Sequence, residues 1–145
     1  MALASVLAPT LSAAPHAVSP AADTRDGRLR AILDRLALAI GADAAFLADA
    51  DGLCLGASGG LAAEDLERWS AAALAAGGAA ERVAGLTGLE TAARVDVLLA
   101  DERVLHVAAM RGVRGAMFLA TLGHGTPRRE ELARTHRALV HALEA

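Results

Sequence analysis

The sequence lacks several residue types that catalytic and nucleic-acid-binding sites commonly use. Its 145 residues include no Lys, Asn, Gln or Tyr, and the aromatic residues are limited to one Trp and two Phe. The formal net charge of −3 provides no basic surface for nucleic acid. We therefore expect a core built from Leu, Val, Ile and Ala, and no nucleic-acid partner.

Cysteine and long apolar runs are also scarce. The single cysteine, Cys54, excludes an internal disulfide framework and favours the cytoplasm. It lies in an apolar stretch without a neighbouring base, which is typical of an inert core thiol. No apolar run reaches the roughly 20 residues that span a bilayer, so no membrane insertion is expected.

The N-terminal segment is rich in Ala, Ser, Pro and Val and carries almost no charge. Pro9, Pro15 and Pro20 interrupt any helix there, which predicts a disordered tail over 1–25 and one domain over 26–145. A secretory signal is the alternative. It would need a basic start and an unbroken apolar stretch, and this segment has neither, which favours a cytoplasmic protein.

Apolar periodicity predicts the first three elements. A helix over 26–40 ends at Gly41, which can supply a left-handed cap. Two apolar runs, 44–48 and 53–57, flank an Asp-Gly pair that predicts a hairpin turn.

A second helix begins after Gly59-Gly60, and Gly77-Gly78 is expected to weaken or end it. The following residues, 79–86, form either a frayed extension or a separate turn. Three strands in a meander are then predicted over 94–99, 104–110 and 116–122, with a turn over 112–115. A third helix is expected to start at Thr126-Pro127, with Thr126 as its cap.

Residues capable of chemistry are scattered rather than clustered. Asp49 and Asp51 faintly resemble a calcium loop, but no third oxygen ligand or terminal Glu follows, so a hairpin turn explains them and no metal is expected. The Gly-His-Gly-Thr segment over 123–126 could hold an anion at a helix N-terminus, although no Lys or distal acid supports this. Four histidines are expected to be solvent-facing or half-buried: His106, His124, His136 and His141.

Two features predict that the chain pairs with a second copy. The strand over 94–99 would be an aggregation hazard if its edge stayed unpaired. The Ala-rich second helix suits the close approach of another helix. Trp69 should anchor that helix, either in the core or at the dimer seam, with a partly exposed ring as the alternative. The predicted dimer-interface residues are Leu66, Trp69, Ala73, Val95 and Val97.

The order α-β-β-α-β-β-β-α resembles the Roadblock/dynein-light-chain domain. The segment over 41–58, GADAAFLADADGLCLGAS, is similar to the family's first hairpin, G-x-x-x-x-x-L-x-x-x-D-G-L-x-x-x-x-S. The segment over 64–71, EDLERWSA, is similar to its second helix. The likeness covers everything after the tail and is greatest to the bacterial members of the MglB type, which partner Ras-like small GTPases.

The resemblance implies an α+β fold with a five-stranded antiparallel sheet, one helix on one face and two on the other. It also implies a homodimer in which the second helices pack together and the third strands meet edge to edge.

Two classes of function follow. The first is a non-enzymatic regulator or scaffold that binds a Ras-like small GTPase and modulates its nucleotide state or location. By the resemblance, such a protein orients the GTPase's own residues, so it needs no catalytic residue and no cofactor. The alternative is a small-ligand sensor module, which requires a cavity with convergent polar groups. The inward positions that the sequence identifies are aliphatic, which favours the regulator.

Overall fold

A computed structural model describes residues 24–89, 94–112 and 115–144. The predicted tail over 1–25 lies outside these ranges except for its last two residues, Thr24 and Arg25. No described helix combines the length and apolar content that crossing a bilayer requires. In chain order, the described elements are α2 (Arg25–Ile40), β1 (Ala42–Asp49), β2 (Cys54–Ala57), α3 (Ala63–Leu86), β3 (Arg94–Leu98), β4 (Val104–Gly112), β5 (Gly115–Gly123) and α4 (Arg129–Glu144).

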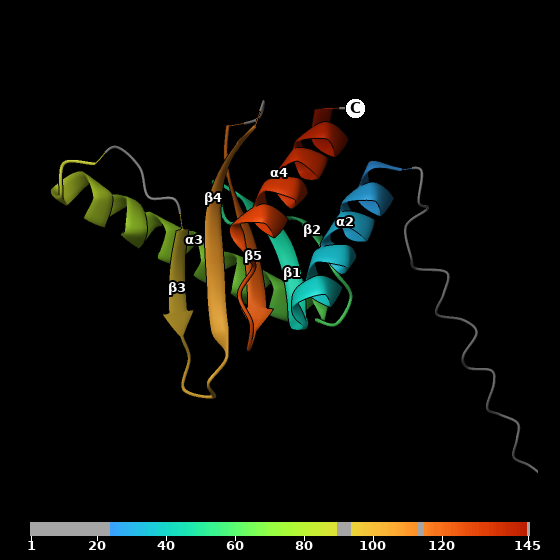
Figure 1. Cartoon of the computed structure of the whole chain (residues 1–145), viewed down its shortest axis with the longest axis horizontal. Coiled ribbons are helices and arrows are strands. Elements are labelled where there is room, and N and C mark those ends of the chain that lie inside the picture. Colours follow the sequence, from blue (N-terminus) through green and yellow to red (C-terminus); the bar gives the residue numbers. More distant parts are fainter. Residues whose placement is uncertain (1–23, 90–93, 113–114, 145) are drawn as a thin grey trace, which may run out of the picture.

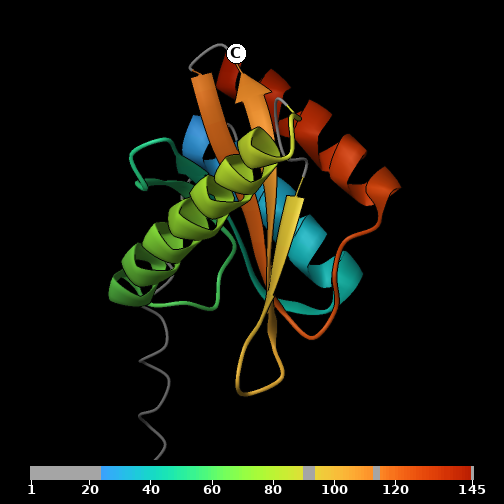
Figure 2. The same cartoon turned by 90° about the vertical axis from the view of Figure 1, so that its left-hand side faces the viewer.

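The strands form one antiparallel sheet in the order β2-β1-β5-β4-β3. Helix α3 crosses one face of the sheet, and α2 and α4 lie side by side on the other (Figures 1 and 2). This arrangement confirms the predicted α-β-β-α-β-β-β-α order and the five-stranded antiparallel sheet with helices on both faces. The hairpin and the meander join where β1 pairs with β5, so β3 is left at an edge.

The alternation of side chains along β5 divides the core into two layers. Met117 and Leu119 pack with α2 and α4, whereas Phe118 and Leu122 pack with α3. Both phenylalanines, Phe46 and Phe118, belong to the α3 layer. The buried residues of the other layer are Leu, Ala and Met alone, as expected for a chain with so few aromatic residues.

The predicted boundaries of α2 and of the first hairpin are confirmed within one or two residues. The Thr24 hydroxyl accepts a hydrogen bond from the Gly27 N–H at 3.0 Å, which caps α2 at its start. Gly41 ends the helix with a φ of 65°. In the hairpin turn, Asp49 Oδ1 accepts hydrogen bonds from the N–H groups of Asp51 and Leu53, so Asp49 has the turn-forming role that the sequence predicted.

Helix α3 continues without a break from Ala63 to Leu86, so the prediction that it ends at Gly77-Gly78, with a separate turn over 79–86, is wrong. Gly77 is buried and faces Phe118 of β5. A Cβ at Gly77 would lie 2.4 Å from Phe118 Cε1, closer than two carbon atoms can approach. The glycine therefore lets the helix axis lie close to the sheet, and this packing outweighs the roughly 1 kcal/mol that glycine costs in a helix.

Helix α4 begins at Arg129, two residues after the predicted start at Pro127, so the expected Thr126 cap is wrong. The Arg128 carbonyl accepts the first helical hydrogen bond, from the Leu132 N–H at 3.0 Å. The Glu131 carboxylate accepts a hydrogen bond from the Arg128 N–H at 2.9 Å. A carboxylate that reaches back to the residue before the helix is one half of a capping box, and it fixes the start of α4.

The strands of the meander differ from their predicted lengths by a few residues. β3 ends at Leu98, one residue earlier than expected, and β4 and β5 extend to Gly112 and Gly123. The turn predicted over 112–115 falls partly outside the described residues.

The contact between Gly77 and Phe118 leads to a test with a matched control. Gly77→Ala should destabilise the protein by about 1–3 kcal/mol, because the added methyl group cannot fit without moving the helix or the ring. Gly78→Ala should stabilise it by about 0.4–1 kcal/mol. The nearest atom to a Cβ at Gly78 is Arg82 Nη1, at 3.8 Å.

Urea denaturation of both variants and the wild type measures these free energies. Equal effects of the two substitutions would show that α3 does not approach the sheet at Gly77.

Candidate functional site

The residues that could perform chemistry do not converge. No group of three or more His, Cys, Asp or Glu side chains in the described ranges is placed to hold a metal ion. Gly123 and Gly125 have packing roles, because a Cβ at either would lie 2.9 Å from backbone atoms, of Ala42 and Ile40 respectively. The segment over 123–126 also precedes the start of α4 by several residues, so it does not form the anion site considered from the sequence.

Two residues differ in burial from their sequence-based predictions. His106 is 1% exposed rather than solvent-facing or half-buried, and its Nδ1 contacts the Asp96 carboxylate on the neighbouring strand β3. Cys54 is exposed rather than a core thiol, because it begins β2 at the other edge of the sheet. Partial desolvation of its sulfur raises the pKa of Cys54, which keeps the thiol protonated at neutral pH.

The edge strand β3 is the first part of a candidate protein-interaction surface. It pairs with β4 on one side, and no described strand pairs with its other side. Val95 and Val97 face the α3 layer, and the exposed Leu98 lies on the opposite face. The free edge presents backbone N–H and C=O groups that a further strand can pair with.

The outer face of α3 is the second part. Ala71, Ala75, Ala79 and Val83 are all exposed and lie four residues apart, so they form one row along the helix. At the C-terminal end Leu86 is 87% exposed. That end of α3 extends past β3, beyond the edge of the sheet (Figure 1).

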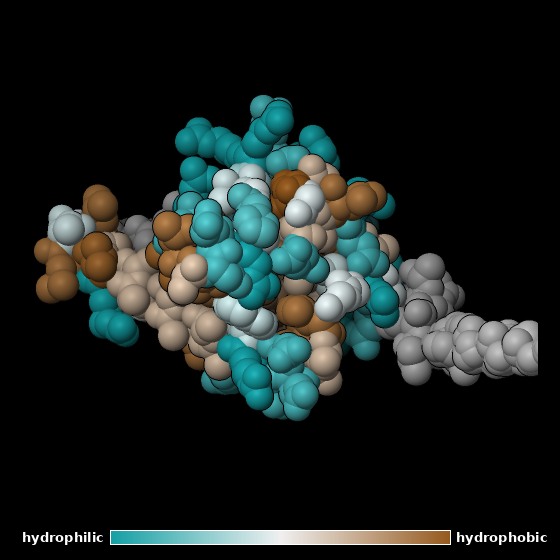
Figure 3. Space-filling model, turned by 90° about the horizontal axis from the view of Figure 1, so that it is seen from below, coloured by the Kyte–Doolittle hydropathy of each residue, from teal (hydrophilic) through white to brown (hydrophobic). Residues whose placement is uncertain are grey.

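Figure 3 shows apolar side chains gathered on the projecting end of α3. The exposed large apolar residues of this region are Val83, Leu86 and Leu89. Monomeric proteins rarely expose such a group without a use for it. We refer to the β3 edge together with the outer row and projecting end of α3 as the β3–α3 surface.

The five residues predicted for the dimer interface lie together, but on the inner side of this surface. Leu66, Trp69, Val95 and Val97 are partly buried and pack onto the α3 layer of the core. Ala73 is 0% exposed, so its side chain offers no surface to a partner of a single folded chain. A role of the other four in pairing stays a prediction. The exposed row was not predicted from the sequence, because the break expected at Gly77-Gly78 would have interrupted it.

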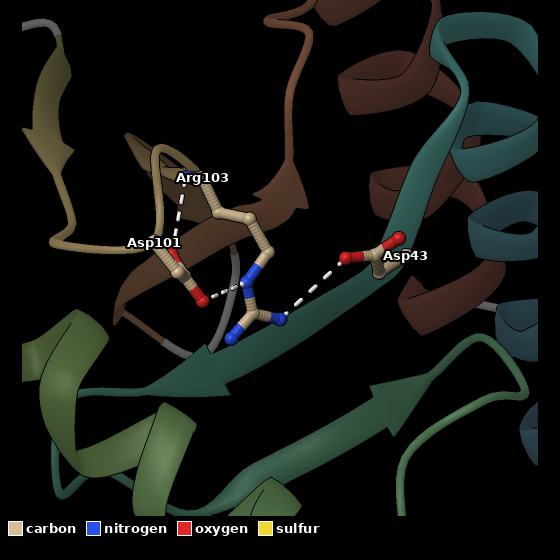
Figure 4. Close-up of polar contacts among 3 residues, drawn as sticks. All are labelled: Asp43, Asp101 and Arg103. Carbon is tan, nitrogen blue, oxygen red and sulfur yellow. Dashed lines mark hydrogen bonds and ion pairs between the residues drawn. The ribbon is translucent and has the colours of Figure 1, made fainter.

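A charged cluster holds the β3–β4 turn against the rest of the domain (Figure 4). Arg103 Nε donates to Asp101 Oδ2 at 2.7 Å, and Arg103 Nη1 lies 3.5 Å from Asp43 Oδ2 on β1. The guanidinium also lies over the Trp69 ring of α3, 5.8 Å from its centroid. Arg103 therefore connects the turn to both β1 and α3. Because the turn directly follows β3, these contacts also hold that end of β3 in place.

Asp101 is held in its ionised form by the same residue. Hydrogen bonds from the backbone N–H and from the guanidinium of Arg103 lower the pKa of Asp101 below its usual value. The turn also contains Glu102 at a φ of 70°, a left-handed conformation that is uncommon for a residue other than glycine. The paired carboxylate of Asp101 and the bond from the Arg103 N–H stabilise this turn.

This cluster predicts a pH-dependent stability. Folding lowers the pKa of Asp101, so its ionised carboxylate stabilises the folded state above the unfolded-state pKa of about 3.9. This stabilisation is lost as the pH falls through the folded-state pKa. Asp101→Asn should therefore lower the melting temperature at pH 7, and the difference from the wild type should shrink below about pH 4. Trp69 fluorescence can follow both melts. Glu102→Gln, the neighbouring charge, is the control, and an equal pH-dependent loss there would contradict the role of Asp101.

Comparison with known proteins supports the architecture. No protein-family model matches the sequence, and no curated protein matches it. The structure of Myxococcus xanthus MglB is similar, with a TM-score of 0.66 and 17% identity over 81% of this chain and 95% of that chain. An MglB structure described as having a tetrameric arrangement gives a TM-score of 0.65 and 19% identity over 83% of this chain and 90% of that one. The Roadblock/LC7 domain from Streptomyces avermitilis gives a TM-score of 0.59 and 21% identity over 79% of this chain and 93% of that chain. At these identities the likeness establishes the fold, and the chain has the roadblock fold that its sequence predicted.

Proposed function

We propose that the chain is a non-enzymatic regulatory or scaffold protein that forms a homodimer and binds a Ras-like small GTPase in the cytoplasm, modulating the GTPase's nucleotide state or location. The main support for the proposal is that a roadblock fold presents the β3–α3 surface. One edge of β3 pairs with no strand among the described residues, and it lies beside an exposed apolar helix face.

The geometry of that surface supports a homodimer. A second copy related by a two-fold axis can pair its β3 with this β3, because an antiparallel edge is self-complementary. The same axis brings the two α3 helices together, and the small side chains of Ala71, Ala75 and Ala79 permit a close approach. The projecting end of α3 would then lie over the partner's half of the joined sheet, which covers Val83 and Leu86. An MglB structure described as tetrameric supports assembly of this fold.

The proposal of a GTPase partner rests on the resemblance of the chain to MglB-type roadblock proteins. The similarity in fold to Myxococcus xanthus MglB supports that resemblance. A protein of this kind acts by binding the GTPase and orienting the GTPase's own catalytic residues. The proposal therefore requires no nucleophile, metal or cofactor on this chain. It requires only a surface that distinguishes one nucleotide state of the partner from the other.

The dimer is tested by sedimentation equilibrium of the full chain at micromolar concentration, where we expect a dimeric mass. Ala75→Arg should weaken dimerisation at least about tenfold, because it places a charge and a long side chain in the close helix–helix contact. Ala31→Arg is the matched control, since Ala31 is an exposed alanine on α2, across the sheet. A monomeric wild type, or equal effects of the two substitutions, would contradict the proposed interface.

The partner is tested with a purified Ras-like small GTPase from the same organism, loaded with GTP or GDP. We expect the chain to bind one nucleotide state preferentially and to change the rate of GTP hydrolysis or of nucleotide release. A fluorescent nucleotide analogue measures both rates. If every such GTPase of the organism bound neither state and kept unchanged rates at saturating concentrations of the chain, the regulator function would be wrong even if the dimer were real.

A further inference from the structure

A cavity of about 300 Å³ opens between the N-terminal half of α4 and the sheet. Its floor is formed by β4 and β5, with Ala108, Met110 and Leu119 among the lining residues. One face of α4 forms the opposite wall, because Arg129, Leu132, Ala133 and His136 are spaced three, four and seven residues along the helix. The volume is at the lower end of the range for small-molecule sites.

The cavity exists because the two halves of α4 pack differently. The C-terminal half buries Leu139 and Ala142 in the core with α2. The N-terminal half contributes the partly buried Leu132 and the buried but polar Thr135. Small residues at Ala108 and Ala133, on opposite walls, leave the space between helix and sheet unfilled.

The polar side chains that line the cavity are all basic. Arg94 of β3 and Arg129 of α4 line it from opposite sides, and His136 adds an imidazole one turn beyond Leu132. No carboxylate is among the lining residues, and none of these three side chains forms an ion pair within the described residues. The positive end of the α4 dipole adds to the same potential.

From this arrangement we infer that the cavity binds a small organic anion: a carboxylate or phosphate head held between Arg94 and Arg129, with an aliphatic body on the apolar floor. A guanidinium group matches the planar oxygens of a carboxylate or phosphate and can bind them in bidentate fashion. The aliphatic lining stabilises a hydrocarbon body through the hydrophobic effect.

The lining also argues against other ligands. None of the described residues that line the cavity is Phe, Trp or Tyr, so a large aromatic ring would lack an apolar stacking partner. A metal ion or an organic cation would be repelled by the two arginines. The free anion and the same headgroup on a lipid share one chemistry, and the experiment below separates them. The site lies on the opposite face of the sheet from α3, and of its lining residues only Arg94 belongs to the β3 strand of the proposed dimer.

The experiment titrates the full chain with octanoate and with octyl phosphate, and follows the amide resonances of α4 and β4 by NMR. Inorganic phosphate tests the head alone, and 1-octanol tests the body alone. We expect at least one of the two amphiphilic anions to saturate the shifts at a concentration at least about tenfold below that required by inorganic phosphate or octanol. Vesicles containing phosphatidylglycerol test the lipid source of the headgroup.

Three variants locate the site. Arg94→Gln and Arg129→Gln should each weaken binding of the anionic probe at least about tenfold, since each removes a charge-assisted contact. Ala133→Leu should abolish binding by filling the cavity, and Leu keeps a high helix propensity. Arg137→Gln is the matched control, because Arg137 is an exposed arginine of α4 that does not line the cavity. The dimerisation variant Ala75→Arg should bind the probe normally.

The inference is overturned if no soluble probe saturates, if octanol binds as tightly as octanoate, or if Arg137→Gln reduces affinity as much as Arg129→Gln. Sedimentation with anionic vesicles without binding of either soluble anion would overturn it as well, because a membrane surface would then be the ligand. Binding of the soluble probes that is lost in Ala133→Leu, with or without vesicle binding, supports the site.

Discussion

At Gly77, α3 approaches the sheet more closely than any residue with a Cβ would allow. A Cβ at this position would collide with Phe118, the central aromatic residue of the α3 layer. Because the glycine removes that collision, the helix can lie along the sheet and continue straight to Leu86, past the edge strand. A helix that ended at Gly77 would lack the second half of the exposed row, Ala79 and Val83, and the apolar end that projects past the β3 edge.

The sequence predicted the elements whose signals are local. The apolar stripe of α2, the Asp-Gly hairpin turn and the three strands of the meander all follow from periodicity and turn chemistry within a few residues, and the structure contains each of them. The prediction for α3 failed because a distant contact decides its length, and the prediction for α4 failed because a different local cap decides its start. Glycine weakens a helix locally, but the partner of Gly77 lies on β5, far along the chain. Thr126-Pro127 is a good local start for a helix, yet Glu131 fixes the start of α4 two residues later.

The candidate surface was predictable only in outline. Both faces of α3 are rich in alanine, so composition indicated a helix suited to close packing without showing which face meets the sheet. The sequence analysis therefore selected Ala73, which is buried, and missed the exposed row that includes Ala75. The cavity beside α4 was not predictable, because it depends on the angle at which that helix leaves the sheet and on residues from three strands.

An interaction surface and a cavity thus lie on opposite sides of one sheet, and the proposed homodimer requires the β3 edge that no described strand occupies to pair with a second copy. Amide hydrogen exchange of residues 94–98, measured over a range of protein concentrations, tests that claim most directly. If the β3 edges pair, the exchange of these amides slows as the concentration rises through the dimerisation range, while the exchange of β5 at the centre of the sheet stays unchanged. Rapid exchange of the outward-facing β3 amides at every concentration, with dimeric mass in solution, would show that the dimer forms through another surface.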